Sequence, residues 1–386
     1  MGKTCKIVPA TSLDYRELSE KKLPRFMFDY IDGGANDEIT LRNNVSDFQS
    51  IRIKQQVLRD LTTLDTSTTF AGEKFGMPLI IAPVGMAGLY NTRGEVQGVR
   101  AANRANIPFT LSTVGICPLE EIAAAATKPF WFQLYMVRDR SAVRKLLDRA
   151  VAAGCNTLVF TVDLPMAGMR HRDTRNGMLD NTLKGKLGKA WQIGTRPSWI
   201  WNVGINGKPH SFGNIADMVE DSSDLNAYRA WLDTQFDTSV TWKDIEWLRD
   251  IWKGRLIIKG IQEVNDAKEC VRVGADGLIV SNHGGRQLES VVSSIRKLPA
   301  IAEAVGDQLE VLMDGGVRGG LDIFKAVAYG AKAVLIGRPW VWAMSGAGEA
   351  GLSALLATFK RELEVGMGLA GVTRIDQISR DLIDHD

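Results

Sequence analysis

One histidine in this sequence has the setting of a catalytic base. The chain has four histidines, and of these His283 alone directly follows a short apolar run typical of a buried strand, 277–280. Gly284 and Gly285 come next and leave the imidazole uncrowded, and Arg286 can hold an anion beside it. A base next to an anion-binding guanidinium indicates proton abstraction from a substrate that carries a carboxylate; a purely structural histidine is the alternative.

Two glycine-rich segments late in the chain have the features of a phosphate site. They read DGGVRGG from residue 314 and GR from residue 337. Glycine lets main-chain N–H groups approach an anion, and Arg318 and Arg338 can add charge-assisted hydrogen bonds. Ordinary turn glycines could account for either segment alone, but two such segments that each carry an arginine favour a phosphate site.

Short apolar runs along the chain predict the strands that carry these residues. Each run is hydrophobic almost without interruption, which is typical of parallel strands covered on both faces. Helical segments lie between most of them, at 94–106, 139–154, 264–275 and 321–331. The eight runs are PLIIAPVG from 78, PFTLSTVG from 108, FWFQLYM from 130, TLVFTVD from 157, RLIIKGI from 255, GLIVSNHGG from 277, EVLMDGG from 310 and AVLIGRP from 333.

This alternation of strands and helices predicts an α/β fold, a (β/α)8 TIM barrel. The rival is an open doubly wound sheet, in which the glycine-rich loop follows the first strand, whereas here such loops come at the end. In a barrel the residues just past each strand meet at one mouth. We therefore expect His283, Arg318 and Arg338 to converge there.

The chain is expected to form a single domain over residues 1–386, with the barrel at about 76–386. Two helical stretches near the start precede the barrel and are expected to pack over it. About ninety residues separate the fourth and fifth strands, far more than in a normal loop. We interpret the part at about 176–215 as an insertion, and 242–252 as the helix that leads into the fifth strand.

The bulk composition narrows the function. The formal net charge is +2, too small to indicate nucleic-acid binding. Cys5, Cys117, Cys155 and Cys270 lie far apart with no CxxC pair, so we expect small buried thiols in a reducing compartment, with no disulfide framework and no metal site. The sequence has no signal-peptide core, and no apolar run approaches the ~18 residues of a spanning helix. A protein that is cytoplasmic, or attached to one membrane face, is expected.

Motifs along almost the whole chain resemble the FMN-dependent 2-hydroxy-acid dehydrogenase and oxidase family. SNHGGRQL at 281–288 matches the family's signature around its histidine, and other matches follow the family's order: LPRFMFDYIDGGANDE, PLIIAPVG, WFQLY, FTVD, IIKG, DGGVRGG and IGRP. The resemblance implies a barrel that binds FMN and oxidises an L-2-hydroxy acid to the 2-keto acid. One departure is Glu289, where the family usually has Asp; it keeps the charge, and we expect no change in the reaction.

The resemblance also implies the catalytic roles. His283 would take a proton from the substrate, and Asp163 would hydrogen-bond the imidazole and stabilise its protonated form. Tyr135 would contact the substrate hydroxyl. The residues leave open whether His283 takes the hydroxyl proton during hydride transfer or the α-proton to leave a carbanion, because both routes need the same groups.

A substrate clamp follows from the same resemblance. Arg286 and Arg170 would hold the substrate carboxylate, where a planar guanidinium gives two parallel bonds, and Tyr30 would contact it as well. The plainer interpretations are a core aromatic for Tyr30 and a solvated charge for Arg170.

The cofactor residues implied by the resemblance lie at the strand ends. Lys259 would lie near the N1/O2 edge of the flavin and stabilise the negative charge of its reduced form. The isoalloxazine and ribityl parts would be lined by Pro83, Val84, Gly85, Ser112, Gln133, Thr161 and Ser281. The ribityl and phosphate would be held by Asp314, Gly315, Gly316, Arg318, Gly337 and Arg338.

Substrate size is indicated by one position. Glycolate oxidases of the family carry Trp where this chain has Val114, and a smaller side chain leaves room for a substituent beyond glycolate. The stretch PSWIWNVGINGKPHSFGNI resembles bacterial members that oxidise lactate. Lactate is therefore the first choice and mandelate-like acids the second.

The insertion bears on the electron acceptor. Between residues 184 and 213 the basic residues are Lys184, Lys186, Lys189, Arg196 and Lys208, with no acidic residue, and Trp191, Trp199 and Trp201 lie among them. Tryptophan with local positive charge is attracted to an anionic membrane surface, at roughly 1 kcal/mol per basic residue. Membrane-associated relatives carry a membrane-binding segment here; a surface loop with packed aromatics is the alternative. We expect peripheral contact with the cytoplasmic face of the inner membrane through 184–213 and a quinone as acceptor.

Three rival functions keep the same fold. A soluble oxidase would pass the electrons to oxygen, and an FMN-dependent isomerase would carry out no net oxidation. The third rival is a flavin-binding protein without catalysis, for which an intact set of reactive groups has no use. The resemblance also implies a homo-oligomer, most commonly a tetramer in this family.

Overall fold

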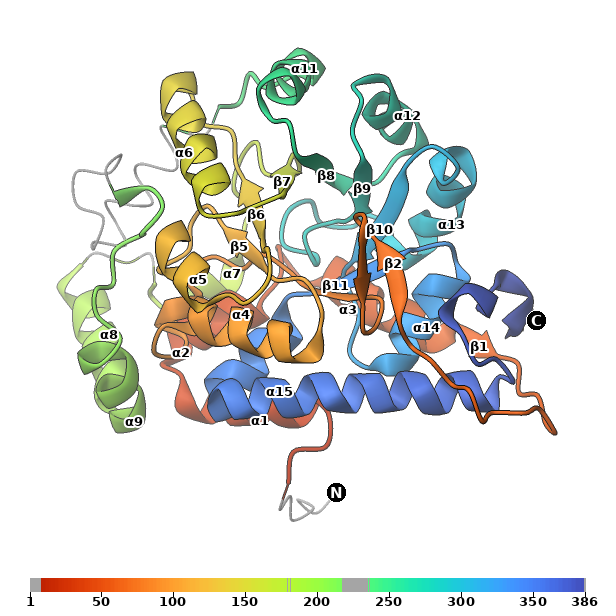
Figure 1. Ribbon diagram of the computed structural model, residues 1–386. Coiled ribbons are helices and arrows are strands. Elements are labelled where there is room, and N and C mark those ends of the chain that lie inside the picture. The colour runs from red at the N-terminus through yellow and green to blue at the C-terminus, as the bar shows by residue number, and fades with distance from the viewer. Residues whose placement is uncertain (1–7, 179, 181, 217–234, 236, 385–386) are drawn as a thin grey trace.

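A closed ring of parallel strands forms the centre of the protein. Eight strands make one sheet in the order β4-β11-β10-β9-β8-β7-β6-β5, and a parallel bridge between Ile81 and Phe109 joins its two edges. The predicted barrel is therefore confirmed and the open sheet excluded (Figure 1). The strands are β4 (Leu79–Ile81), β5 (Thr110–Ser112), β6 (Trp131–Leu134), β7 (Thr157–Thr161), β8 (Arg255–Ile261), β9 (Gly277–Val280), β10 (Glu310–Asp314) and β11 (Ala333–Ile336).

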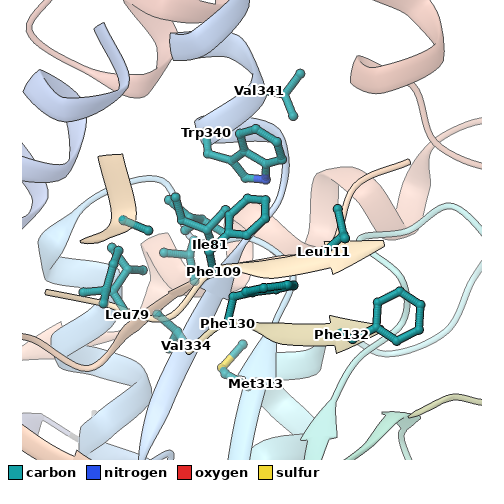
Figure 2. Close-up of a cluster of buried hydrophobic side chains, with 14 of the residues drawn as sticks. Leu79, Ile81, Phe109, Leu111, Phe130, Phe132, Met313, Val334, Trp340 and Val341 are labelled. Carbon is teal, nitrogen blue, oxygen red and sulfur yellow. The ribbon is translucent and has the colours of Figure 1, made fainter. Parts of the chain in front are cut away.

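This description comes from a computed structural model, which describes residues 8–178, 180, 182–216, 235 and 237–384. Helices surround the barrel because the strands are apolar on their outer face as well as their inner face. In Figure 2 Phe109, just before β5, and Ile81 of β4 lie below Trp340 at the start of α15, and the rings of Phe109 and Trp340 meet edge to face at 6.3 Å. The surrounding helices are α4 (Gly94–Ala105), α5 (Leu119–Ala125), α6 (Arg140–Ala152), α11 (Trp242–Ile251), α12 (Val264–Arg272), α13 (Ser294–Val305), α14 (Gly320–Ala328) and α15 (Arg338–Leu369). The helices predicted between strands are thus confirmed, while the single-domain assignment over 1–386 stays a prediction.

The amino end of the barrel is closed by a hairpin that the sequence did not reveal. Strands β2 (Thr68–Phe70) and β3 (Glu73–Phe75) pair in antiparallel fashion. Phe70 packs on Phe75 and, edge to face at 6.4 Å, on Trp131 inside the barrel. These side chains join Val159, Ile257 and the other inward residues in one buried apolar cluster.

The segment before the barrel forms three helices, α1 (Ser12–Lys22), α2 (Arg25–Asp32) and α3 (Ile39–Ser50). The first two confirm the predicted leading helices, and α1 lies along α15 (Figure 1). Helix α3 was not predicted, because its buried stripe is Thr40, Asn44 and Phe48, of which only the last is apolar. A terminal pair of strands, β1 (Arg52–Ile53) and β12 (Ile383–Asp384), was also not foreseen.

The predicted insertion contains α8 (Leu183–Gly194), α9 (Pro197–Trp199) and η2 (Ile200–Ile205), preceded by α7 (His171–Arg175). It lies at one side of the barrel in Figure 1, with α8 against α2. Within the described ranges, every helix is too short or too polar to span a bilayer. Cys117, Cys155 and Cys270 are buried free thiols as predicted, and Cys5 lies outside the described residues.

Candidate active site

A cavity of about 770 Å³ lies at the carboxyl ends of the strands, within the size range of small-molecule and cofactor sites. The predicted residues that line it are Tyr30, Pro83, Val84, Gly85, Tyr135, Thr161, Arg170, Lys259, His283, Arg286, Asp314, Gly315, Gly316, Arg318, Gly337 and Arg338. The remaining predicted residues, which do not line the cavity, are Ser112, Gln133, Asp163 and Ser281. Asp163 and Ser281 are hydrogen-bonded to the cavity residues His283 and Lys259, and Ser112 donates to Gln133. The sequence therefore identified the side chains that come together at this mouth.

Strand geometry explains why polar side chains reach the cavity. Successive side chains of a strand point to opposite faces, so residues two apart share a face. On five of the strands an apolar residue inside the barrel is followed two positions later by a polar one: Trp131 by Gln133, Val159 by Thr161, Ile257 by Lys259, Ile279 by Ser281 and Leu312 by Asp314. One apolar layer thus forms the floor on which the polar layer rests.

The imidazole of His283 is held by a carboxylate. Its Nδ1 lies 2.8 Å from Oδ1 of Asp163. Because an ionised carboxylate only accepts, Nδ1 donates and Nε2 is left as the basic nitrogen. Burial raises the pKa of Asp163, but the charges of His283 and Lys259 and the hydrogen bond from His283 outweigh it and lower that pKa. Asp163 is therefore ionised and holds the imidazole through Nδ1.

The loop that carries His283 has an uncommon backbone. His283, Gly284 and Gly285 have φ angles of 56°, 63° and 73°, in the left-handed region that glycine adopts without strain. A Cβ on Gly285 would also lie 2.6 Å from the main-chain nitrogen of Leu41. The two glycines thus allow the turn and the close approach of α3. From the sequence, they are expected only to leave the imidazole uncrowded.

Helix α3 supports this loop from behind. Asn44 and Asn282 exchange two amide hydrogen bonds of 2.8 Å, and the main-chain N–H of Gly285 donates to Asn282 at 3.0 Å. Nothing in the sequence marked Asn44, because a single Asn in a polar stretch carries no pattern. At the start of α3, Glu289 accepts from the N–H of Ile39 at 2.6 Å, so the residue that departs from the family pattern acts on a helix end, away from the base.

Two guanidinium groups face the cavity beside the base. The guanidinium carbons of Arg170 and Arg286 lie 4.8 and 5.1 Å from the centre of the Tyr30 ring. Arg170 pairs with Asp173 at 2.9 Å, whereas Arg286 donates to the main-chain oxygens of Tyr30 and Gly33 at 2.6 and 2.9 Å. Burial, and then the neighbouring charge of Arg170, lower the pKa of Arg286. Two cations on one aromatic ring form a site suited to a carboxylate.

Lys259 is buried in the wall of the cavity. Its Nζ lies 3.0 Å from Oγ of Ser281 and 3.0 Å from a carboxylate oxygen of Asp314. Burial alone would lower the pKa of Lys259, but Asp314 and Asp163 outweigh it and raise that pKa. A fixed positive charge is therefore held inside the cavity.

The walls contain polar atoms that fit a flavin. The buried side-chain atoms without a partner in the described part of the chain include Oγ1 of Thr161 and Oδ1 of Asp314 in the cavity wall and Nε2 of Gln133 on β6. Leaving such groups unpaired is costly. The carbonyls and N–H of an isoalloxazine ring and the hydroxyls of a ribityl chain supply the complementary donors and acceptors. The residues present thus fit FMN.

The end of the cavity near α15 fits a phosphate. Gly315 and Gly316 have φ angles of 90° and 94°, and a Cβ on Gly316 would lie 2.0 Å from the carbonyl oxygen of Asn44. Burial lowers the pKa of Arg318 to about 10, which leaves it positive at neutral pH. The N-terminus of α15 begins after Gly337, and such a terminus favours an anion.

The insertion contributes to the cavity wall, which sequence reasoning missed. Met178, Lys189 and Ile193 line the cavity together with Val114 of the barrel. Lys189 and Ile193 are four apart on α8, so one face of this helix borders the cavity. The spacing could have suggested this face only if the position of the helix had been known.

Comparisons with known proteins agree with this geometry. Residues 19–385 match the family described as FMN-dependent dehydrogenase. The chain is 50% identical over 377 residues to an L-lactate dehydrogenase of Ectopseudomonas mendocina (strain ymp), which covers 98% of this chain and 99% of that protein. An L-lactate dehydrogenase of Alcaligenes faecalis is 48% identical with coverage of 98% and 99%.

Solved structures show the same similarity. A structure described as the monotopic membrane protein (S)-mandelate dehydrogenase superposes with a TM-score of 0.91 at 33% identity, covering 98% of this chain and 100% of the other. Mandelate oxidase superposes with a TM-score of 0.82 at 35% identity over 98% of each chain. From the motif order, the barrel and the match over residues 19–385, the chain belongs to the family of FMN-dependent dehydrogenases.

Proposed function

We propose that this protein oxidises L-lactate, or a close L-2-hydroxy acid, to the 2-keto acid and passes the electrons to a membrane quinone. The observation that carries the first part is the meeting of His283, Asp163 and two arginines at one cavity. The lactate assignment is supported by the relatives named L-lactate dehydrogenase and by the small Val114 at the cavity wall. A mandelate-like acid is the second candidate, favoured by the mandelate dehydrogenase neighbour.

In this proposal Arg170 and Arg286 hold the substrate carboxylate, with Tyr30 between them. Tyr135 contacts the substrate hydroxyl and lies at the same cavity. Burial, and then the charge of Asp163, raise the pKa of Tyr135, so its phenol remains a hydrogen-bond donor. In this proposal these contacts bring the hydroxyl group and the hydrogen-bearing carbon of the substrate within reach of Nε2 of His283.

His283 takes one proton from the substrate at Nε2, and Asp163 stabilises the resulting imidazolium through Nδ1. When bound, FMN supplies the acceptor for the two electrons that leave the substrate. Lys259 contributes positive charge on the flavin side of the cavity. The residues that would hold the cofactor are Pro83, Val84, Gly85, Ser112, Gln133, Thr161, Ser281, Asp314, Gly315, Gly316, Arg318, Gly337 and the main chain at Arg338.

Mixing the purified yellow protein with L-lactate in the absence of oxygen tests this proposal. We expect L-lactate to bleach the absorbance of the oxidised flavin after mixing, and D-lactate, the control, to leave it unchanged. Faster bleaching by L-mandelate would favour the second candidate. No bleaching by either acid, in protein with full FMN content, would contradict the proposal.

The proposal that a membrane quinone accepts the electrons is supported by the exposed surface of the insertion. Leu183, Leu187 and Trp191 recur every four residues along α8 and are 73%, 62% and 75% exposed. Side chains spaced by four lie on one helix face, and basic residues flank them. Such a face is expected to enter the interface of an anionic bilayer. This supports peripheral attachment to the cytoplasmic face of the inner membrane through 184–213.

Flotation with lipid vesicles tests the attachment. We expect binding to vesicles with anionic lipid and a loss of about tenfold or more in the Leu187→Asp variant, because a charge on this face opposes burial. Val151→Asp is the matched control, since Val151 is an exposed apolar residue of α6 outside the insertion. Equal binding by both variants would contradict a membrane role of this face.

Two further measurements address the acceptor and the assembly. Slow peroxide formation with fast quinone reduction supports the dehydrogenase, whereas peroxide equal to lactate consumed supports a soluble oxidase. We also propose that the protein forms a homo-oligomer, a tetramer, on the family resemblance. Light scattering of the purified holoprotein measures its mass, and a monomer mass would contradict this.

A further inference from the structure

The side chain of Arg338 donates hydrogen bonds to three main-chain oxygens. Its Nε donates to Asp32 at 3.1 Å, one terminal nitrogen to Gly33 at 2.8 Å and the other to Gly284 at 2.9 Å. The residue is buried, and within the described ranges no carboxylate forms an ion pair with it. A guanidinium has five N–H donors in a fixed fork, so these three divergent bonds fix its orientation.

The three acceptors belong to the two segments that carry the catalytic groups. Asp32 and Gly33 lie at the carboxyl end of α2, where carbonyls have no partner inside the helix and carry partial negative charge. The same end accepts Arg286 at Gly33 and presents Tyr30 to the cavity. Gly284 directly follows His283 in the left-handed turn.

Arg318 differs from Arg338 in its environment. Its guanidinium donates to the adjacent carbonyl of Val317 at 2.8 Å and lies over the Trp342 ring at 5.1 Å. Its side-chain hydrogen bond stays within its own segment, and the contact with Trp342 of α15 engages no N–H donor. Arg318 can therefore turn its whole guanidinium group to a phosphate, whereas Arg338 could offer only the two N–H groups that its bonds to Gly284 and the end of α2 leave over.

We propose that the Arg338 side chain is a positioning residue that clips the His283 loop to the end of α2, while the FMN phosphate is held by Arg318 and by main-chain N–H groups at the start of α15. The inference deepens the proposed function, and its kinetic part rests on that function. Through this clip the base and the carboxylate clamp keep a fixed distance from each other. Loss of the clip impairs proton transfer more than cofactor binding.

The first test separates a clip from a phosphate ligand without measuring activity. Apoprotein is titrated with FMN and with riboflavin, which lacks the phosphate, and flavin fluorescence reports both affinities. In Arg318→Met we expect the preference for FMN over riboflavin to fall at least tenfold. In Arg338→Lys we expect it to stay within threefold of the unaltered protein. A fall in Arg338→Lys as large as that in Arg318→Met would overturn the proposal.

The second test measures flavin reduction by L-lactate in FMN-saturated protein. Arg338→Lys keeps the charge but loses the fork, and we expect the reduction rate constant to drop at least tenfold. In Arg338→Ala, added guanidinium should restore part of the rate while ammonium should not, a readout that general loss of structure would not give. Unchanged reduction in Arg338→Lys, or no rescue by guanidinium in a folded Arg338→Ala, would contradict the clip. If the unaltered protein is not reduced by lactate, the proposed function fails, and the titration still decides the role of Arg338.

Discussion

The two ends of the barrel are built from the same eight strands but serve different purposes. At the amino end the hairpin β2–β3 closes the interior with the buried aromatic side chains of Phe70, Phe75 and Trp131. At the carboxyl end the next inward layer is polar and borders the cavity. One step of two residues along a strand thus separates the residues that stabilise the barrel from those that border the cavity. Substitutions at the two ends should therefore have opposite signatures.

The largest effect is expected at the carboxyl end, from His283→Gln. Loss of the base should lower the rate constant of flavin reduction by about 10²–10⁴-fold, the usual contribution of general-base catalysis. FMN content and melting temperature should stay close to those of the unaltered protein, since the amide retains the shape of one imidazole edge. Stopped-flow absorbance measures the rate. Near-normal turnover in this variant would reject His283 as the base.

The next effect is expected at the amino end, from Phe70→Ala. Removing a buried aromatic ring leaves a cavity and should lower the free energy of unfolding by about 3–5 kcal/mol. Denaturant unfolding of the holoprotein measures this. The rate of flavin reduction in the folded protein should be unchanged, because the hairpin lies on the far side of the inward apolar layer. A large loss of reduction rate with little loss of stability would break the contrast between the ends.

A smaller effect is expected from Arg286→Lys. A lysine cannot form two parallel bonds with a carboxylate, and losing one bond to a charged group costs about 1.5–3 kcal/mol. KM for L-lactate should therefore rise by roughly 10–150-fold, with a lesser change in kcat. Steady-state kinetics with an artificial acceptor measures both. Arg296→Lys is the matched control, because this exposed arginine of α13 pairs with Asp47 away from the cavity.

The smallest effect is expected from Glu310→Gln at the amino end. Glu310 accepts from the N–H of Ala71 in the hairpin and pairs with Arg255 at 3.1 Å, and both charged side chains are partly exposed. Such a pair contributes about 0–1 kcal/mol, because solvent screens it. Unfolding should shift by that amount, with no change in flavin reduction. A loss above that of Phe70→Ala would show that the ion pair, and not the aromatic cluster, closes this end.

The sequence predicted the barrel and most of the site because both follow from local patterns. Continuous apolar runs mark parallel strands, and the residues after them must meet at one mouth, as His283, Lys259 and Asp314 do. Their chemical roles remain predictions. The family motifs narrowed the candidates further.

The supporting residues could not be predicted because they act through long-range contacts. Asn44 lies 238 positions from Asn282, and no local pattern connects the two. The same holds for Arg338, whose glycine-arginine motif indicated a phosphate ligand while its bonds run to Asp32, Gly33 and Gly284. Such contacts depend on where the cover helices α2 and α3 dock on the barrel. The hairpin β2–β3 was missed because strands of three residues are too short to show alternation.

The most direct measurement is a crystal structure of the oxidised FMN-bound protein with pyruvate, the keto acid of the proposed reaction. The account predicts the pyruvate carboxylate on Arg170 and Arg286, and its keto oxygen within about 2.6–3.2 Å of Nε2 of His283. A pyruvate bound elsewhere, or an imidazole turned away from the keto group, would contradict the account.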